Sequence, residues 1–361
     1  MMNNNDTQKE TKLFTLPIIT TGVLFMMGLW GCLAIYSASG FSEHPFKYAG
    51  RQLLWLIIGI LVLIISSKIK FRFYEKNIII IGIIAYISLF GVLINGTSFN
   101  GMKGWYNLGI CLLQPSEIIK PIYILTLSTI FKNNTTSKKT IIFLPLLTLL
   151  WAIPIILQPD FGTLTVYIFG AFAVYLLAGG QKRYLLCLAL LGAIFALYIF
   201  YTKSYVAARI TGYLNPNAHP NGSGWHILQL QYALARGGIS GTSWGKALWS
   251  NNYLPLAYSD SSFASLTESI GFIGALPVIL GFTTLAIAGY KLSQKAKSKS
   301  YEIFIFSATT LITAQAFIHM SVNVALLPPT GITLPLFSYG GSSMISTMLC
   351  FGMILSAAKE K

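Results

Sequence analysis

Long apolar runs separated by short polar segments are the dominant pattern along this chain. Runs of about 18 or more apolar residues suit membrane-spanning helices, because a bilayer core needs about 20 helical residues. The pattern therefore predicts about ten spans. Their expected ranges are 16–38, 50–67, 77–95, 112–131, 141–157, 161–180, 183–201, 262–290, 302–326 and 332–357. We expect an all-α polytopic membrane protein that forms a single membrane domain, residues 1–361.

Composition supports a membrane protein and argues against a soluble one. Hydrophobic residues make up 54% of the chain and charged residues only 10%, whereas soluble domains carry about 25% charged residues. The mean hydropathy is +0.66. A net charge of +15 could indicate nucleic-acid binding. However, the basic residues gather in alternate loops, beginning with Lys68, Lys70, Arg72 and Lys76, and at both termini. This bias follows the positive-inside rule and places both termini, including the tail 1–15, in the cytoplasm.

One loop is far longer than the others. Residues 202–261 lie between the predicted seventh and eighth spans, on the extracytoplasmic side, and are rich in glycine and aromatic residues. Loops of this length are usually functional or disordered, and this composition is not typical of disorder. Ile227, Leu230 and Leu234 have helical spacing, which predicts an amphipathic helix on the outer surface. A purely structural cap remains the alternative.

Two acidic positions in or beside the spans have more than one reading. Ionisable groups inside a membrane cost roughly 2.5–3.5 kcal/mol at the midplane, so each needs a reason. Glu117 and Lys120 are spaced i,i+3 and can pair, either as a polar cavity wall or as a structural ion pair. Asp160 precedes a predicted helix in a short outer turn. It suits an N-cap, and the same helix N-terminus could also shape an anion pocket.

Asp260 and Glu268 form a second acidic pair, at the end of the long loop. Glu268 lies about two helical turns deeper than Asp260 on much the same face. Two stacked carboxylates at the mouth of a membrane cavity favour catalysis or substrate binding over packing. Outer cations such as Arg51 and Arg209 suit a pyrophosphate at the headgroup level, although ordinary snorkelling is the alternative.

Several motifs together resemble the SEDS family (shape, elongation, division and sporulation). The most informative is the string Gly331-Ile332-Thr333-Leu334-Pro335-Leu336-Phe337-Ser338-Tyr339-Gly340-Gly341-Ser342-Ser343. Other matching segments are Arg51-Gln52, Gly104-Trp105, Gln114-Pro115-Ser116-Glu117, Gln158-Pro159-Asp160-Phe161-Gly162-Thr163, Arg209-Ile210, Gln229, Arg236-Gly237-Gly238, Tyr253-Leu254-Pro255 and Glu268-Ser269-Ile270-Gly271. Their order and spacing cover most of the chain. Ser321-Val322-Asn323 and Leu327-Pro328 look closer to the FtsW-like branch of the family than to RodA.

The resemblance implies a peptidoglycan glycosyltransferase in the bacterial inner membrane, at the division septum if the FtsW-like branch applies. Its substrate would be lipid II, and its partners a class B penicillin-binding protein and other divisome or elongasome membrane proteins, with no nucleic acid. By position, Asp260 is the catalytic carboxylate. No metal ligand is assigned, although Mg²⁺ or Mn²⁺ could accompany the pyrophosphate. The expected substrate-binding residues are Arg51, Trp105, Glu117, Lys120, Asp160, Arg209, Gln229, Glu268, Ser338 and Ser342.

The chain departs from the family near the expected catalytic residue. The family usually reads His-Thr-Asp-Phe-Ile-Phe-Ala where this chain reads Tyr258-Ser259-Asp260-Ser261-Ser262-Phe263-Ala264. Ser269 replaces a second family carboxylate, and Gly104 replaces a basic residue. These changes bear on the pKa of Asp260, on acceptor contacts and on the need for a partner. A lipid II flippase or transporter, and a non-enzymatic division scaffold, are therefore kept as alternative functions.

Overall fold

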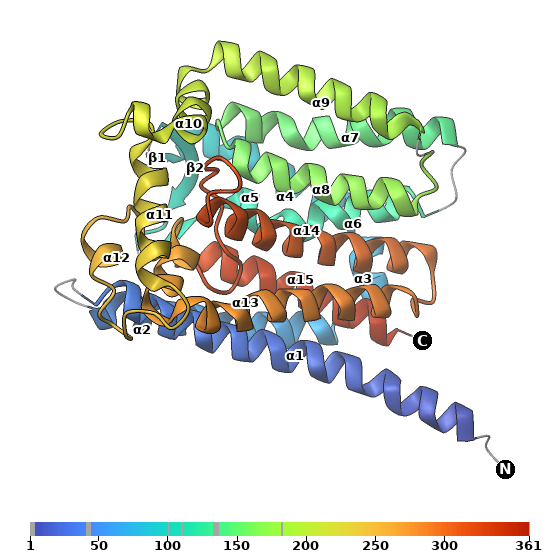
Figure 1. Ribbon diagram of the computed structural model, residues 1–361. Coiled ribbons are helices and arrows are strands. Elements are labelled where there is room, and N and C mark those ends of the chain that lie inside the picture. Colours follow the sequence, from blue (N-terminus) through green and yellow to red (C-terminus); the bar gives the residue numbers. More distant parts are fainter. Residues whose placement is uncertain are drawn as a thin grey trace.

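The computed structural model describes residues 4–40, 45–99, 101–109, 111–132, 137–181 and 183–360. Helices run side by side along one axis and form a bundle (Figure 1). The helices are α1 (Asn4–Ala38), α2 (Pro45–Lys68), α3 (Phe71–Lys76), α4 (Ile78–Asn95), α5 (Pro115–Ile118), α6 (Lys120–Ile130), α7 (Ser137–Leu157), α8 (Phe161–Leu177), α9 (Arg183–Thr202), α10 (Ser204–Leu214), the 3₁₀ turn η1 (Pro216–Ala218), α11 (Trp225–Gly237), α12 (Leu248–Asn252), α13 (Ser262–Ser293), α14 (Lys299–Asn323) and α15 (Gly341–Lys359).

Six of the described helices are long and apolar enough to cross a membrane, namely α1, α2, α4, α13, α14 and α15. Shorter apolar helices cover Ile142–Leu157, Phe161–Leu177 and Gly192–Thr202. Large apolar side chains are exposed on the bundle surface, for example Ile79 at 74% and Ile94 at 75%. Such a surface is costly in water and suits contact with lipid tails. The chain is therefore a multi-pass membrane protein.

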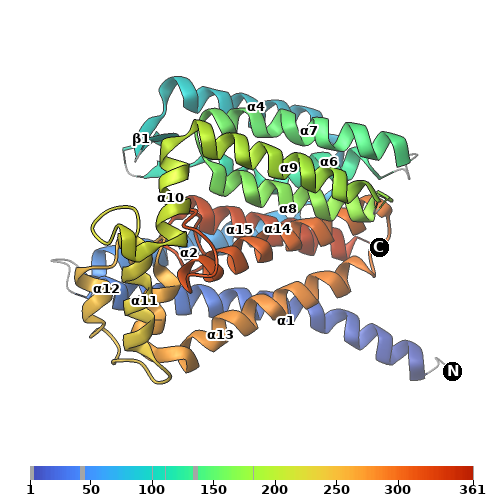
Figure 2. The same cartoon turned by 45° about the horizontal axis from the view of Figure 1, so that its top comes forward.

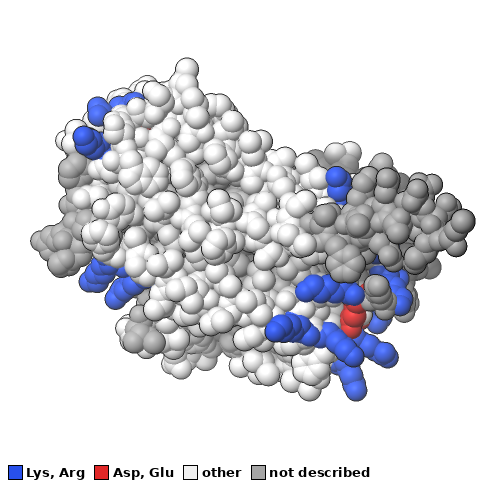
Figure 3. Space-filling model, turned by 90° about the horizontal axis from the view of Figure 1, so that it is seen from below, with Lys and Arg blue, Asp and Glu red and all other residues white. Residues whose placement is uncertain are grey.

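Both chain ends lie at one end of the bundle, and the segment from α10 to α12 lies at the other (Figure 1, Figure 2). Lys and Arg side chains gather at the two ends of the face in Figure 3, and more of them are at the end that carries the C-terminus. This arrangement agrees with the predicted pairing of the termini on one side. It also sets residues 202–261 at the opposite end.

The sequence prediction needs correction in two spans. Residues 112–131 are not one helix, because Ile119 separates α5 from α6 and Leu112–Leu113 form a strand. Residues 332–340 are not helical either, and α15 begins only at Gly341. In both places the freed backbone is held by polar side chains from other helices, described below, which is how membrane proteins tolerate broken helices.

A small antiparallel sheet was also missed by the all-α prediction. Strands β1 (Thr97–Phe99), β2 (Met102–Asn107) and β3 (Leu112–Leu113) pair in the order β1-β2-β3 between α4 and α5. Gly101 turns the first hairpin with a φ of 82°, a conformation that glycine adopts without steric cost. The sheet lies at the same end of the bundle as α10 (Figure 1).

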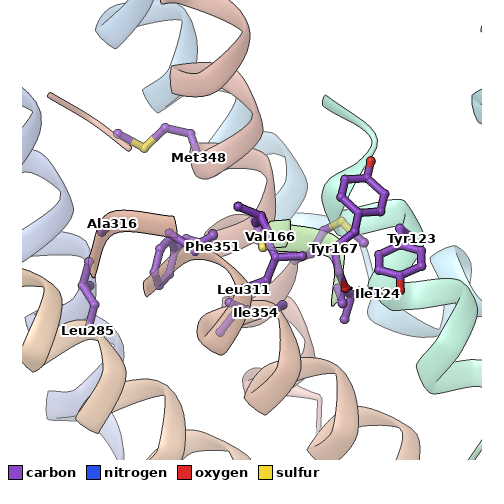
Figure 4. Close-up of a cluster of buried hydrophobic side chains, with 14 of the residues drawn as sticks. Tyr123, Ile124, Val166, Tyr167, Leu285, Leu311, Ala316, Met348, Phe351 and Ile354 are labelled. Carbon is purple, nitrogen blue, oxygen red and sulfur yellow. Dashed lines mark hydrogen bonds between the residues drawn. The ribbon is translucent and has the colours of Figure 1, made fainter. Parts of the chain in front are cut away.

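The core of the bundle is apolar and joins elements from the whole chain. Figure 4 shows Tyr123, Tyr167, Leu311, Phe351 and other buried side chains meeting from α6, α8, α14 and α15. The rings of Tyr123 and Tyr167 stack with centroids 4.6 Å apart. This packing fixes α14 between α8 and α13, and α14 carries several of the site residues described next.

Candidate functional site

Glu268 holds the long outer segment onto α13. Its side chain is fully buried, and its carboxylate accepts hydrogen bonds from the backbone N–H groups of Trp249 at 2.9 Å and Ser250 at 2.6 Å, and from the Ser250 hydroxyl. Arg236 adds an ion pair at 3.3 Å. The structure thus gives Glu268 an anchoring role for the outer segment, and its expected role in substrate binding stays a prediction.

Gln229 belongs to the same anchor. Its side-chain oxygen accepts a hydrogen bond from the Trp249 indole at 2.9 Å, and the residue is 7% exposed. The predicted amphipathic helix is present as α11, with Ile227 and Leu230 buried against α13. Gln229 thus contributes to packing of the outer segment, and its expected contact with substrate stays a prediction.

The helix α13 bends where this segment crosses it. Gly271 has a φ of 70°, and a Cβ atom there would lie 2.2 Å from the carbonyl oxygen of Ile239. Phe272 and Ile273 donate their backbone N–H groups to the carbonyls of Gly238 and Ile239. The loop therefore supplies the hydrogen bonds that the helix loses at the bend.

Asp260 lies at the outer end of α13, two residues before the helix begins. Its backbone carbonyl accepts a hydrogen bond from the Asn323 amide at 2.9 Å, and the same Asn323 side chain accepts from the N–H of Ala264 at 2.9 Å. A Cβ atom on Gly331 would lie 3.8 Å from the Asp260 carboxylate. Asp260 is thus held through its backbone, and its carboxylate faces the segment that precedes α15.

The electrostatic surroundings of Asp260 suit a base that works near neutral pH. Burial raises the pKa of Asp260 to about 6, while the Ser259 hydroxyl and the charge of Arg209 oppose this shift. Arg209 is exposed on α10 and stands over the ring of Tyr205 at 5.8 Å. Burial and Arg209 also lower the pKa of His226 to about 4, so this neighbouring histidine is neutral. The carboxylate is ionised at pH 7 and more basic than an exposed aspartate.

A buried polar network behind Asp260 was missed by sequence reasoning. His319 is 1% exposed and bonds the carbonyl of Ile332 at 2.8 Å, and its other ring nitrogen lies 3.3 Å from the Ser262 hydroxyl. Ser338 bonds Ser262 at 2.9 Å and donates to the carbonyl of Ser259 at 2.6 Å. His319 and Asn323 are one turn apart in an apolar helix, and this i,i+4 polar pair was the available signal. Ser338, predicted to bind substrate, is 2% exposed and holds this loop in place.

Glu117 and Lys120 form a buried ion pair, as their spacing predicted. The Lys120 ammonium lies 2.6 Å from the Glu117 carboxylate and 2.7 Å from the side-chain oxygen of Gln315 on α14. Gln315 in turn donates to the carbonyl of Thr333 at 2.9 Å. The pair therefore links the break between α5 and α6 to the non-helical segment before α15.

Asp160 caps α8, as the sequence also suggested. One carboxylate oxygen accepts from the N–H of Thr163 at 3.0 Å and the other from the Gln114 side chain at 3.1 Å. The Gln114 backbone N–H donates to the Ser342 hydroxyl at 2.9 Å. Burial raises the pKa of Asp160. Asp160 and Ser342 are thus both bonded to Gln114, Asp160 to its side chain and Ser342 to its backbone.

The segment before α15 joins the two clusters. A Cβ atom on Gly162, in the first turn of α8, would lie 2.7 Å from both Ile332 and the Thr330 carbonyl, while Gly331 faces Asp260. Gln52 on α2 secures the far end by bonding the Ser338 carbonyl at 3.2 Å and the Gly340 N–H at 3.3 Å. The string Gly331–Ser343 is therefore the structural centre of the site.

Arg51 and Trp105 lie on α2 and β2. Arg51 is exposed on α2 beside Gln52. Trp105 is half-buried in β2, where its carbonyl accepts a hydrogen bond from Thr97 and its ring meets Phe99 at 5.3 Å. Within the described residues, no three His, Cys, Asp or Glu side chains come together as a metal site.

Comparisons with known proteins identify relatives over nearly the whole chain. Residues 14–361 match the FtsW/RodA/SpoVE family model, described as cell cycle protein. The chain is 31% identical over 366 residues to stage V sporulation protein E of Bacillus subtilis, covering 98% of this chain and 99% of that protein. It is 31% identical to the probable peptidoglycan glycosyltransferase FtsW of Legionella pneumophila, covering 94% and 90%.

Solved structures share the fold. A chain from a peptidoglycan synthase complex that coordinates polymerisation and crosslinking aligns with a TM-score of 0.80 and 23% identity, covering 96% of this chain and 97% of that one. The rod shape determining protein RodA of Thermus thermophilus aligns with a TM-score of 0.71 and 24% identity, covering 94% and 95%. At these identities the likeness concerns the arrangement of helices.

Proposed function

This chain belongs to the FtsW/RodA/SpoVE family, and from that premise we propose that it is a peptidoglycan glycosyltransferase that polymerises glycan strands from lipid II. The observation that carries the proposal is Asp260, which lies two residues before α13 and whose pKa is raised by burial to about 6. Two relatives named FtsW have the words peptidoglycan glycosyltransferase in their names.

The proposed topology keeps the sequence expectation of about ten spans. The spans would be α1, α2, α4, the broken pair α5–α6, α7, α8, α9, α13, α14 and α15, with both termini in the cytoplasm. Residues 202–261 would then face the outside between the seventh and eighth spans, as one part of a single membrane domain. The excess of Lys and Arg at the end with the C-terminus supports this orientation. The membrane would be the bacterial inner membrane, with the septum favoured by the FtsW-like motifs.

The proposed chemistry needs a base and a stabiliser for the leaving group. A sugar hydroxyl is a poor nucleophile, and Asp260 would accept its proton as the new bond forms, with inversion at the donor carbon. Arg209 lies within electrostatic reach of Asp260, and with Arg51 it would neutralise the departing undecaprenyl pyrophosphate. The Glu117–Lys120 pair, Asp160 and Ser342 would form the polar wall below the reaction.

A divalent cation would have to take most of its ligands from the pyrophosphate itself. Oxygen ligands are what Mg²⁺ and Mn²⁺ prefer, and Asp260 is the only carboxylate we assign to the reaction. The penicillin-binding protein in our proposal is supported by the similar chain from a synthase complex. The other divisome or elongasome partners rest on the family resemblance.

The direct test is polymerisation of lipid II by purified protein. Wild-type protein should make long glycan, and Asp260→Ala should make none while remaining folded and inserted. Translocation of lipid II without glycan would indicate a flippase, and neither activity would indicate a scaffold. Full polymerisation by Asp260→Ala would refute the assignment of Asp260.

A further inference from the structure

A cavity of about 450 Å³ lies between α3, the end of α6 and the start of α14. Arg72 and Glu75 line it from α3, Lys132 lines it just after α6, and the four residues from Ser298 to Tyr301 line it at the start of α14. α3 and the C-terminus lie at the same end of the bundle (Figure 1). The volume is within the range of roughly 300–1,000 Å³ that is usual for small-molecule sites.

Aromatic packing and the C-terminal segment fix the walls of this cavity. The ring of Phe71, which is fully buried, lies 4.8 Å from the ring of Tyr301 and 4.8 Å from that of Phe304. The Glu360 carboxylate accepts hydrogen bonds from the Arg72 backbone N–H at 3.1 Å and from the Tyr301 hydroxyl at 2.7 Å. Contacts within the chain therefore hold α3 against the start of α14, and the cavity is part of the fold.

Two of the residues that line the cavity carry a buried polar atom with no hydrogen-bond partner among the described residues. One is the hydroxyl of Ser300, a residue that is only 2% exposed, and the other is Oε1 of the Glu75 carboxylate. Buried polar groups in native proteins are nearly always paired, so both atoms need an explanation. The hydroxyl can donate and the carboxylate can only accept. A ligand that satisfies both therefore has an acceptor and a donor.

Three cations line the same cavity. In the described part of the chain, an ion pair is recorded for Lys299 but not for Arg72 or Lys132. Lys299 lies 3.0 Å from Glu302, which does not line the cavity, and an ammonium group with three donors keeps two for another acceptor. Lys299 and Ser300 also lie in the first turn of α14, where the helix dipole favours an anion. The acceptor in the ligand is therefore an anion.

The cavity is set where membrane-spanning helices end. α14 begins at Lys299, and α3 lies between α2 and α4, which are long and apolar enough to cross a membrane, as α14 is. Exposed apolar side chains adjoin the cations: Phe73 follows Arg72 and is 55% exposed, and Ile130, two residues before Lys132, is 51% exposed. An anion at this level that continues into apolar chains is a phospholipid, and basic pockets between transmembrane helices bind such headgroups.

We propose that this cavity binds the headgroup of an anionic phospholipid that carries a phosphodiester and hydroxyl groups, as phosphatidylglycerol does. The phosphodiester accepts a hydrogen bond from the Ser300 hydroxyl and faces the cations Arg72, Lys132 and Lys299, because Arg and Lys are the usual partners of phosphate. A headgroup hydroxyl donates to the Glu75 carboxylate. The bound lipid belongs to the leaflet at the end of the bundle that carries the C-terminus.

Native mass spectrometry of the purified full chain with added lipid tests the site. Wild type should bind dioleoylphosphatidylglycerol about tenfold more tightly than dioleoylphosphatidylcholine, whose headgroup has a phosphate but no hydrogen-bond donor. The double variant Arg72→Gln, Lys132→Gln should weaken binding of phosphatidylglycerol on the order of 20-fold, because each cation contributes about fivefold. The matched control is Lys76→Gln, Lys297→Gln, which removes the same charge from exposed residues that do not line the cavity. It should stay within about twofold of wild type, since solvent screens these charges.

Ser300→Ala provides a test that does not depend on charge. It should weaken binding of phosphatidylglycerol about tenfold and leave the thermal stability unchanged, because the hydroxyl has no partner among the described residues. If the double variant fails to fold, Ser300→Ala decides the question by itself. Equal binding of the two lipids by wild type, or unchanged binding of phosphatidylglycerol in the variants of cavity residues, would overturn the inference. So would binding of inorganic phosphate without phosphatidylglycerol, which would indicate a soluble ligand. None of these measurements uses polymerisation, so absence of glycan synthesis would contradict the proposed function alone.

Discussion

The substitution Glu268→Gln should open the outer segment locally without unfolding the helix bundle. Glu268 accepts from two backbone N–H groups, at 2.9 Å from Trp249 and 2.6 Å from Ser250, and from the Ser250 hydroxyl. Glutamine keeps the volume but presents an amide donor to at least one of these groups. Leaving one buried donor unpaired costs about 1–3 kcal/mol, and losing bonds to a charged acceptor adds to this. We expect a local cost of about 3 kcal/mol.

Hydrogen exchange is the appropriate assay, because it reports opening free energies segment by segment. A cost of about 3 kcal/mol corresponds to exchange on the order of 100-fold faster at Trp249 and Ser250. The control is Arg236→Gln, since the Arg236 side chain is 43% exposed and such a pair contributes at most about 1 kcal/mol. Exchange at Trp249 and Ser250 that is equal in Glu268→Gln and wild type would refute the anchoring role. Loss of polymerisation without faster hydrogen exchange would instead support a role of Glu268 in substrate binding.

Three further predictions concern the interior of the site. Polymerisation by wild type should fall as the pH drops through about 6, because protonated Asp260 cannot act as a base; a falling limb near pH 4 in kcat/KM would contradict the raised pKa. Lys120→Met should destabilise the bundle by about 3 kcal/mol in SDS-induced unfolding, whereas adding Glu117→Gln should recover most of the loss; an equal loss in the double variant would exclude a buried ion pair. Asn323→Ala should lower kcat on the order of tenfold with KM unchanged, since it releases the backbone of Asp260; unchanged kcat would show that Asn323 does not position it.

The spans were predictable because each is a local property of the chain. Apolar runs matched helices at 16–38, 77–95 and 302–326 within a few residues. The non-helical residues 332–340 were not predictable, since hydropathy does not distinguish an apolar loop from an apolar helix. Part of their backbone is satisfied by Gln52 and Gln315, which come from two other helices. Only the folded chain brings these partners together.

The candidate site also contains features that local sequence predicts and contacts that only the folded chain creates. The Glu117–Lys120 pair and the Asp160 cap follow from spacing within a few residues, and both are present. The anchoring contacts of Glu268 with Trp249 and Ser250 were not predictable, because helical periodicity carries no information on the segment that folds over α13. Asp260 itself was proposed from the family resemblance. Its raised pKa depends on burial beneath elements distant in sequence.

The central claim is that the Asp260 carboxylate takes the proton from the acceptor hydroxyl. The most direct measurement compares kcat for lipid II polymerisation by wild type, Asp260→Asn and Glu302→Gln in the same purified preparation. Asparagine preserves the shape and cannot accept the proton, so kcat should fall on the order of 100-fold or more. Glu302→Gln removes a carboxylate that pairs with Lys299 in the first turn of α14, away from Asp260, and should match wild type. A kcat for Asp260→Asn within a few-fold of wild type would contradict the account.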